Sequence, residues 1–270
     1  MKYHALALAP AAWVAAFLVG YSIAHDPVGG GFVRAEAEAV KAIELAGCAL
    51  AMRAFSRGDY LRRAWGMLAG CSALLLARDA VALWSAQRSG AGALLADAPY
   101  EALRTALTLF ANLLSVAGTF MLARAWRVAG LELRGTPLTR AVVMALWVAI
   151  SAAVVGPAVL GDARRAFGGD WSALRWLATD VGDLLALCLM APVLFTALTL
   201  RGGLLRWPWG FLATGLFFWL LYDAARLMGP WLGLSAGQTL ALEESFRAAG
   251  CLYGFAAGAA QALALRERAG

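Results

Sequence analysis

The chain has 270 residues, of which 62% are hydrophobic and 15% are charged, and its formal net charge is +6. Because soluble domains carry about 25% charged residues, this composition excludes an ordinary soluble protein and indicates a membrane protein. The positive charge does not indicate a nucleic-acid partner, since no Lys/Arg-rich run occurs and basic loop residues set the topology of membrane proteins.

Eight apolar segments follow one another along the chain, and a membrane-spanning helix needs about 20 such residues. They cover residues 5–24, 38–56, 63–86, 99–126, 138–160, 172–200, 207–229 and 236–264. The first segment is longer than the apolar core of a secretory signal peptide, so we expect a retained helix. The sequence therefore predicts an all-α, polytopic integral membrane bundle of about eight transmembrane helices.

An internal repeat organises these segments. Residues 57–83 and 201–227 align without a gap at an offset of 144, with 12 of 27 positions identical, and the shared residues include Arg, Gly, Trp and Asp. A weaker match at an offset of 143 pairs residues 101–104 with 244–247. Repeats with an even number of spans have the same orientation, so we expect a pseudo-twofold axis along the membrane normal. Residues 1–130 and 131–270 should then form two parallel four-helix units of one membrane domain.

Both copies of the repeat carry the pattern R-G-x-x-L-R-x-x-W-G-x-L, followed by an apolar helix that ends near an Asp. Through this pattern, residues 42–83 and 183–227 resemble the polytopic sensor regions that precede histidine kinase or diguanylate cyclase modules in bacterial signalling proteins. The resemblance implies a sensor role. The sequence ends soon after the last span without an output domain, so we expect any signal to pass to a separate protein.

Basic residues are unevenly shared between the two sides of the membrane. Loops on the side of the N-terminus hold 13 basic and three acidic residues, whereas the opposite side and its adjoining helix ends hold 10 basic and 14 acidic residues. The positive-inside rule therefore predicts cytoplasmic N- and C-termini in a bacterial cytoplasmic (inner) membrane.

Catalytic and cofactor motifs are absent from the sequence. The two histidines are too few for haem ligation by paired intramembrane histidines, and neither H-E-x-x-H nor G-x-x-x-x-G-K-[ST] occurs. Lys41 is the one remote candidate for a retinal Schiff base. The four cysteines lie inside spans, where packing is the expected role and a soft-metal site is the alternative. We therefore expect no catalytic residue, no metal and no cofactor, and rank a membrane enzyme last.

Ionisable residues in or beside the spans are the main signal for a site, because an intramembrane charge costs about 2.5–3.5 kcal/mol and is rarely left unpaired. Asp79 follows Arg63 by 16 residues, or roughly 24 Å of helix, so it should lie near the outer edge of the bilayer. The repeat places Asp223 at the same depth, and Glu36 aligns with Asp180. The candidate ligand-binding residues form one charged layer near the periplasmic face: Asp79, Arg104, Asp180, Asp183, Asp223, Glu243, Glu244 and Arg247.

Two interpretations of this layer are open. In a structural brace, Asp79 would pair with Arg104, and Asp223 with Arg247. In a functional site, the surplus carboxylates would be neutralised by a cation, a proton or a basic partner. Asn112, an isolated polar residue, is predicted to make an interhelical hydrogen bond rather than to bind a ligand.

The function that the sequence favours is that of a non-enzymatic membrane protein, a sensor or scaffold, that binds a small polar or cationic ligand or a partner subunit at this layer. The alternative is a small transporter or channel with the layer as its outer vestibule. Residues 67–76 and 211–221 contain no ionisable side chain, which disfavours proton-coupled transport through a carboxylate near the midplane. The expected partners are the lipid bilayer and another membrane protein or a second copy of the chain.

Overall fold

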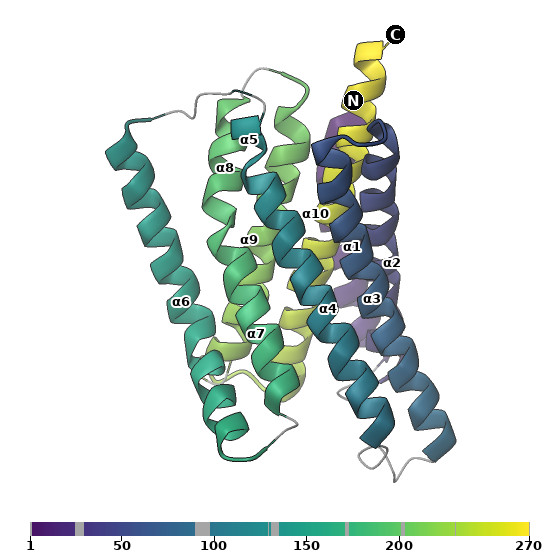
Figure 1. The fold of residues 1–270 in the computed structure, drawn as a ribbon. Coiled ribbons are helices and arrows are strands. Elements are labelled where there is room, and N and C mark those ends of the chain that lie inside the picture. The colour runs from purple at the N-terminus through teal and green to yellow at the C-terminus, as the bar shows by residue number, and fades with distance from the viewer. Residues whose placement is uncertain are drawn as a thin grey trace.

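A computed structural model describes residues 2–24, 30–89, 98–128, 130, 135–170, 173–200, 203–229 and 231–269 of the chain. Within these ranges the protein is helical and contains no strand (Figure 1). The helices are α1 (Lys2–Ala24), α2 (Gly31–Ala54), α3 (Tyr60–Ser89), α4 (Ala98–Ala123), α5 (Ala125–Val128), α6 (Pro137–Phe167), α7 (Ala173–Cys188), α8 (Met190–Thr199), α9 (Arg206–Met228) and α10 (Ala236–Ala269).

Seven helical stretches in the described part of the chain are long and apolar enough to cross a membrane. They are Lys2–Ala24, Tyr60–Trp84, Tyr100–Ala123, Pro137–Phe167, Ala173–Thr199, Arg206–Met228 and Ala236–Glu267. Helix α2 is long enough, at 24 residues, but it is not in this set because charged side chains interrupt its sequence. The expected all-helical architecture is therefore confirmed, and its apolar helices are compatible with a multi-pass membrane protein.

Successive long helices alternate in direction, and both chain termini lie at one end of the bundle (Figure 1). The contacts of Glu267 show this directly: it accepts a hydrogen bond from the Tyr3 hydroxyl at 3.2 Å and lies 3.9 Å from the Lys2 Nζ atom. We call this the termini end, which also holds the turn between α2 and α3. The other end holds the C-terminal ends of α6 and α9 and the N-terminal ends of α7 and α10 (Figure 1).

Six helical stretches form a closed ring. Helix α2 packs on α3, α3 on α4, α4 on α7, α8 on α9, α9 on α10, and α10 returns to α2. Because α8 continues α7 within one stretch, the opposite members of the ring are α2 and α7, α3 and α9, and α4 and α10. Helices α1 and α6 pack outside the ring, mainly on α10 and α7 respectively.

Glycines allow two of the ring contacts to be close. A methyl group added at Gly258 of α10 would overlap the carbonyl oxygen of Gly47 on α2. One added at Gly215 of α9 would lie 3.2 Å from the carbonyl oxygen of Gly250. Small residues are typical of membrane helix interfaces, because they bring backbones into van der Waals contact.

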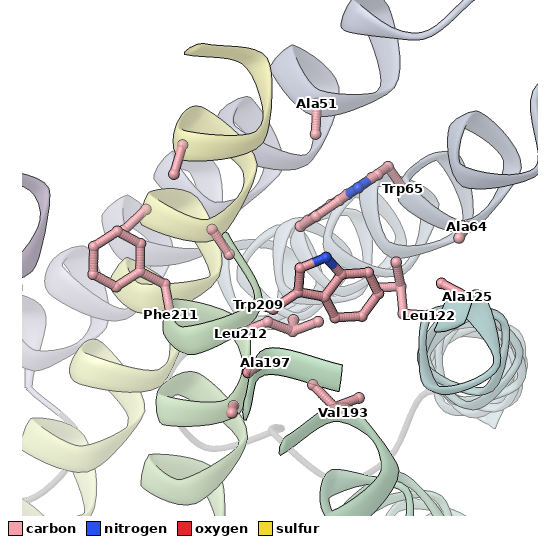
Figure 2. Packing of buried hydrophobic residues seen from close by; sticks show 14 of the residues in the cluster. Ala51, Ala64, Trp65, Leu122, Ala125, Val193, Ala197, Trp209, Phe211 and Leu212 are labelled. Atoms are coloured by element: carbon pink, nitrogen blue, oxygen red, sulfur yellow. The ribbon is translucent and has the colours of Figure 1, made fainter. Parts of the chain in front are cut away.

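A large apolar cluster lies near the termini end of the ring. Trp65 of α3 is 2% exposed and Trp209 of α9 is 6% exposed, and both belong to this cluster. Figure 2 shows their indole rings directed into the same space, with Leu122 and Val193 beside them. We call this group the apolar cluster; it fills the ring between α3, α4, α8 and α9.

The segment predicted as one helix over 172–200 is broken at Leu189, between α7 and α8. Pro192 has no backbone N–H, so it cannot donate to the Cys188 carbonyl as an ordinary helical residue would. The indole Nε1–H of Trp147 on α6 donates to the neighbouring Leu187 carbonyl at 2.9 Å. A side chain from an adjacent helix therefore satisfies a backbone group at the break.

Candidate functional site: a cavity inside the helix ring

A cavity of about 220 Å³ lies inside the ring, and all six stretches contribute to its wall. Its apolar wall includes Leu68, Leu212, Leu216 and Trp219. The polar and ionisable side chains that line it are Lys41, Glu44, Cys71, Ser72, Arg78, Thr108, Asn112, Ser115, Thr119, Thr179, Asp183, Tyr222, Asp223 and Arg247. A polar wall of this kind inside a membrane bundle indicates a site for a polar ligand or for water.

The cavity is elongated along the bundle. On α9 its lining runs from Leu212 to Asp223, which is roughly 16 Å of helix. At the termini end it stops at Leu212, which is itself part of the apolar cluster, and at Leu68, which packs against that cluster. The cavity therefore extends from the charged level of the ring to a closed, apolar floor.

The three basic side chains of the wall are already neutralised. Lys41 pairs with Asp79 and also with Glu38, the latter at 2.9 Å. Arg78 contacts the same Asp79 carboxylate at 2.6 Å. Arg247 pairs with Glu244, one turn before it on α10. Such pairing is expected, because a partly buried charge without a partner is costly.

The three acidic side chains of the wall have no such partners. Among the described residues, no Lys, Arg or His nitrogen lies within 4.0 Å of the carboxylates of Glu44, Asp183 or Asp223. Arg226, on the exposed side of α9, has its guanidinium 5.8 Å from the centre of the Trp176 ring. Because the basic side chains of the wall are neutralised by carboxylates behind it, ionisation of these three carboxylates gives the region an excess of negative charge.

Glu44 lies deep in the structure. It is near the middle of α2, and a methyl group added at Gly254 of α10 would lie 2.7 Å from its Oε1 atom. The Cys251 thiol is within hydrogen-bonding reach of the same carboxylate. Gly254 thus leaves the space that the Glu44 carboxylate occupies beside α10.

The structure separates the residues predicted for the charged layer. Asp183, Asp223 and Arg247 line the cavity. Asp79 and Glu244 lie behind the wall, as partners of the basic side chains that face it. The others do not line the cavity: Arg104 lies 3.2 Å from Glu101, Asp180 is buried beside Asp162, and Glu243 is half-buried on α10.

Both predicted brace pairs are wrong. Arg104 pairs with Glu101 and Arg247 with Glu244, in each case three residues away on the same helix. Residues at this spacing lie on one helix face, so these local pairs form without fixing two helices relative to each other. Glu36 is buried, and one of its carboxylate oxygens accepts a hydrogen bond from the Trp13 indole at 3.2 Å.

The sequence interpretation missed Glu44, and it missed Lys41 as the partner of Asp79. The signal for Glu44 was present, because a carboxylate in the middle of a spanning segment indicates a functional site by default. The prediction for Asn112 is confirmed, since its Nδ2 atom donates to the Ala178 carbonyl on α7 at 2.9 Å. Asn112 also lines the cavity.

Within the described ranges, no three His, Cys, Asp or Glu side chains are arranged so that they could hold a metal ion.

Comparisons with protein-family models, with curated proteins and with solved structures found no match to this chain.

Proposed function

We propose that this protein is a non-enzymatic membrane receptor that binds a small organic cation in the cavity of the helix ring. The observation that carries the proposal is the contrast within the cavity wall. Its basic side chains are paired with carboxylates behind them, whereas Glu44, Asp183 and Asp223 face the cavity without a basic partner within 4.0 Å in the described structure. A cation in the cavity would offset the cost of holding negative charge at low dielectric.

The closed floor of the cavity favours binding over passage. Trp65, Trp209 and Leu122 are almost fully buried in the apolar cluster beneath it. An ion that continued toward the termini end would have to cross this cluster without polar partners. We therefore propose a sensor or scaffold role, in which ligand binding changes the packing of the ring and a separate membrane protein, or a second copy of the chain, responds.

Transport is the second candidate, and one observation favours it. Glu44 supplies the carboxylate near the middle of a spanning segment that the sequence interpretation did not find. The break between α7 and α8 lies beside the cavity, as Ala186 and Leu187 line it, and broken helices beside binding sites are a feature of transporters. Uptake into proteoliposomes of a radiolabelled amine that binds would separate a transporter from a receptor.

We further propose that α2 is the eighth membrane span. Its 24 residues cover roughly 36 Å, enough for a hydrocarbon core of about 30 Å. In the ring it lies between α3 and α10, and its Lys41 and Glu44 face the cavity, away from lipid. The charge distribution of the loops supports cytoplasmic termini in a bacterial inner membrane.

The same proposal includes a parallel repeat of residues 1–130 and 131–270. Opposite members of the ring are the helices that the repeat aligns, and Trp65 and Trp209, which occupy equivalent repeat positions, lie in one cluster. Helix α1 differs from its counterpart α6, because α1 packs mainly on α10 whereas α6 packs on α7. A pseudo-twofold axis would therefore apply to the ring and not to the two outer helices.

The experiment is a thermal-stability measurement on the purified protein in detergent, with methylamine as the cationic probe and methanol and acetate as neutral and anionic controls. We expect methylamine alone to raise the melting temperature, and expect Glu44→Gln, Asp183→Asn and Asp223→Asn each to reduce this increase. Glu267→Gln, which removes a carboxylate at the termini end, is the matched control and should respond like the wild type. If neither methylamine nor any other small organic cation stabilises the wild-type protein, the proposed function is wrong.

A further inference from the structure

We infer that the protein binds one anionic phospholipid on the outside of the helix ring, with an acyl chain in an apolar groove of α8 and α9 and the phosphate on Arg206. This site is separate from the cavity, and it does not depend on the proposed cation. The inference depends on the position of the groove, on its length along the bundle, and on the charge at one end of it.

A groove of about 520 Å³ runs along α8 and α9 and shares no lining residue with the cavity. Its lining includes Met190, Leu194 and Leu198 of α8 and Trp207, Gly210 and Phe217 of α9. On α9, Gly210 and Thr214 of the groove are each two positions before Leu212 and Leu216 of the cavity wall. Two positions correspond to about 200° around a helix, so α9 has nearly opposite faces toward the cavity and the groove.

The lining of the groove comes from α8 and α9 alone in the part of the chain that the structure describes. Helix α6 packs mainly on α7, and Figure 1 shows it diverging from α8 toward the termini end. Its side chains in that half, such as Val142 and Leu146, are exposed. Within the groove, a methyl group added at Gly210 would have no atom within 4 Å. The groove therefore opens toward the surrounding lipid.

The groove has the length of one membrane leaflet. Its lining on α9 runs from Arg206 to Phe217, which is roughly 16 Å of helix, and half of a hydrocarbon core of about 30 Å is roughly 15 Å. Trp207 marks the headgroup level, because tryptophans gather at the membrane interface. Its ring stacks on that of Tyr3 at the termini end, with the ring centres 5.6 Å apart. An acyl chain that begins at this level would fill the groove.

Arg206 supplies a positive charge at the headgroup end of the groove. It is exposed, and its guanidinium carbon lies 5.0 Å from the centre of the Trp207 ring. Among the described residues, no Asp or Glu oxygen lies within 4.0 Å of its nitrogens. It is also the first residue of α9, and the N-terminal end of a helix favours a negative group. A phosphate here would be the bidentate partner that a guanidinium prefers.

The headgroup must decide which lipid binds, because an acyl chain gains no hydrophobic free energy by moving from bulk lipid to an apolar groove. A zwitterionic headgroup carries its own cation beside the phosphate. An anionic headgroup such as that of phosphatidylglycerol leaves its negative charge for Arg206. A helix of a partner protein would also fill the groove, but an anionic lipid matches both the apolar wall and the charge at its end.

Native mass spectrometry of the full-length protein in detergent tests the headgroup, with phosphatidylglycerol and phosphatidylcholine of identical acyl chains as probes. We expect the first phosphatidylglycerol to bind at least about fivefold more tightly, as one basic residue at the surface of a membrane provides. Arg206→Gln should remove this preference. Arg53→Gln, which removes an exposed arginine at the termini end outside the groove, should retain it. A preference that is absent in the wild type, or unchanged in Arg206→Gln, would overturn the inference.

Photolabelling tests the groove itself. Phosphatidylglycerol with a photoreactive acyl chain should label peptides of α8 and α9, and Gly210→Leu, which fills the groove, should reduce this labelling. Gly156→Leu is the matched control, since a side chain at this position of α6 also meets no atom within 4 Å. Thermal melting shows whether each variant is folded, and the stabilisation by methylamine should be the same in both. Labelling confined to other helices, or a dimer of the chain that Gly210→Leu dissociates, would show that the groove is not a lipid site.

Discussion

At the scale of single residues, Asp79 and Asp223 occupy the same repeat position but have different surroundings. Asp79 is held by Arg78 and Lys41, whereas Asp223 lines the cavity without a basic partner within 4.0 Å in the described structure. The sequence explains the difference, because the positions that align with Arg78 and Lys41 at the offset of 144 are Tyr222 and Leu185. The second unit has thus kept the carboxylate and lacks both cations that neutralise it in the first.

Asp79→Asn should destabilise the protein by about 3 kcal/mol, because it leaves Arg78 without a partner and weakens the pairing of a nearly buried Lys41. Asp223→Asn removes a carboxylate that has no ion pair, so its stability should be unchanged or higher. Thermal melting of the two variants in the same detergent, without added amine, measures this contrast. Equal loss of stability in both would show that Asp223 is also part of an ion pair.

At the scale of helices, the charged helix α2 is fixed in the ring by its contact with α10. The contact depends on the absence of side chains at Gly47 and Gly258, where the two backbones meet. It also presents Glu44 to the cavity, because Gly254 lies one turn before Gly258 and leaves space for the carboxylate. The packing of these two helices and the position of the proposed ligand-binding carboxylate are therefore coupled.

Gly258→Ala should lower stability by about 1–3 kcal/mol, because the new methyl group would force the α2 and α10 backbones apart. Gly210→Ala on α9 is the matched control, since no atom lies within 4 Å of the corresponding position. Alanine favours a helix over glycine by about 0.5–1 kcal/mol, so the control should melt at the same temperature or higher. A Gly258→Ala protein as stable as the control would contradict the close contact.

At the scale of the whole molecule, the ring and its two outer helices give the bundle two distinct ends. Lys2 and Tyr3 both contact Glu267 at the termini end, and the apolar cluster closes the ring near that end. Three of the six charged residues of the cavity wall, Arg78, Asp223 and Arg247, lie toward the opposite end. The cavity is therefore asymmetric along the bundle.

Labelling with a membrane-impermeant maleimide should place the two termini on the same side of the membrane. In a background with the four native cysteines replaced by alanine, Lys2→Cys and Glu267→Cys should react from one side, and Trp231→Cys, which follows α9, from the other. Inverted and right-side-out vesicles from one preparation provide the comparison. Reaction of residues 2 and 267 from opposite sides would exclude an even number of spans.

The sequence predicts the helices well, because each long apolar run must form its backbone hydrogen bonds within itself when it lies in lipid. All eight predicted segments coincide with helical stretches, although α2 begins at Gly31 rather than at 38, because its first turns are rich in charge and have low hydropathy. The break at Leu189 was not predicted. Hydropathy carries no information about which backbone carbonyls lose their N–H donors at the break. It also gives no sign that the Trp147 indole donates to the Leu187 carbonyl there.

The site was predicted only in part, because depth along a helix can be read from the sequence but the direction of a side chain around the ring cannot. Three of the predicted residues, Asp183, Asp223 and Arg247, line the cavity. The partners of Asp79 and Arg104 were wrong, since they depend on which helices are neighbours and on pairs within one helix. Glu44 was not predicted, because it lies in the second segment, whereas the expectation of no carboxylate near the midplane was drawn from residues 67–76 and 211–221 alone.

The charged α2 also affects how the protein is made. Lys41 and Glu44 each oppose insertion of an isolated α2 into lipid by about 3 kcal/mol, and the helix depends on α10, which is synthesised about 200 residues later. If α2 is the eighth span, as proposed, it lacks one wall of its final surroundings until α10 has been synthesised. A chain truncated after α9 should therefore leave these charges without that wall and be degraded faster than the whole protein.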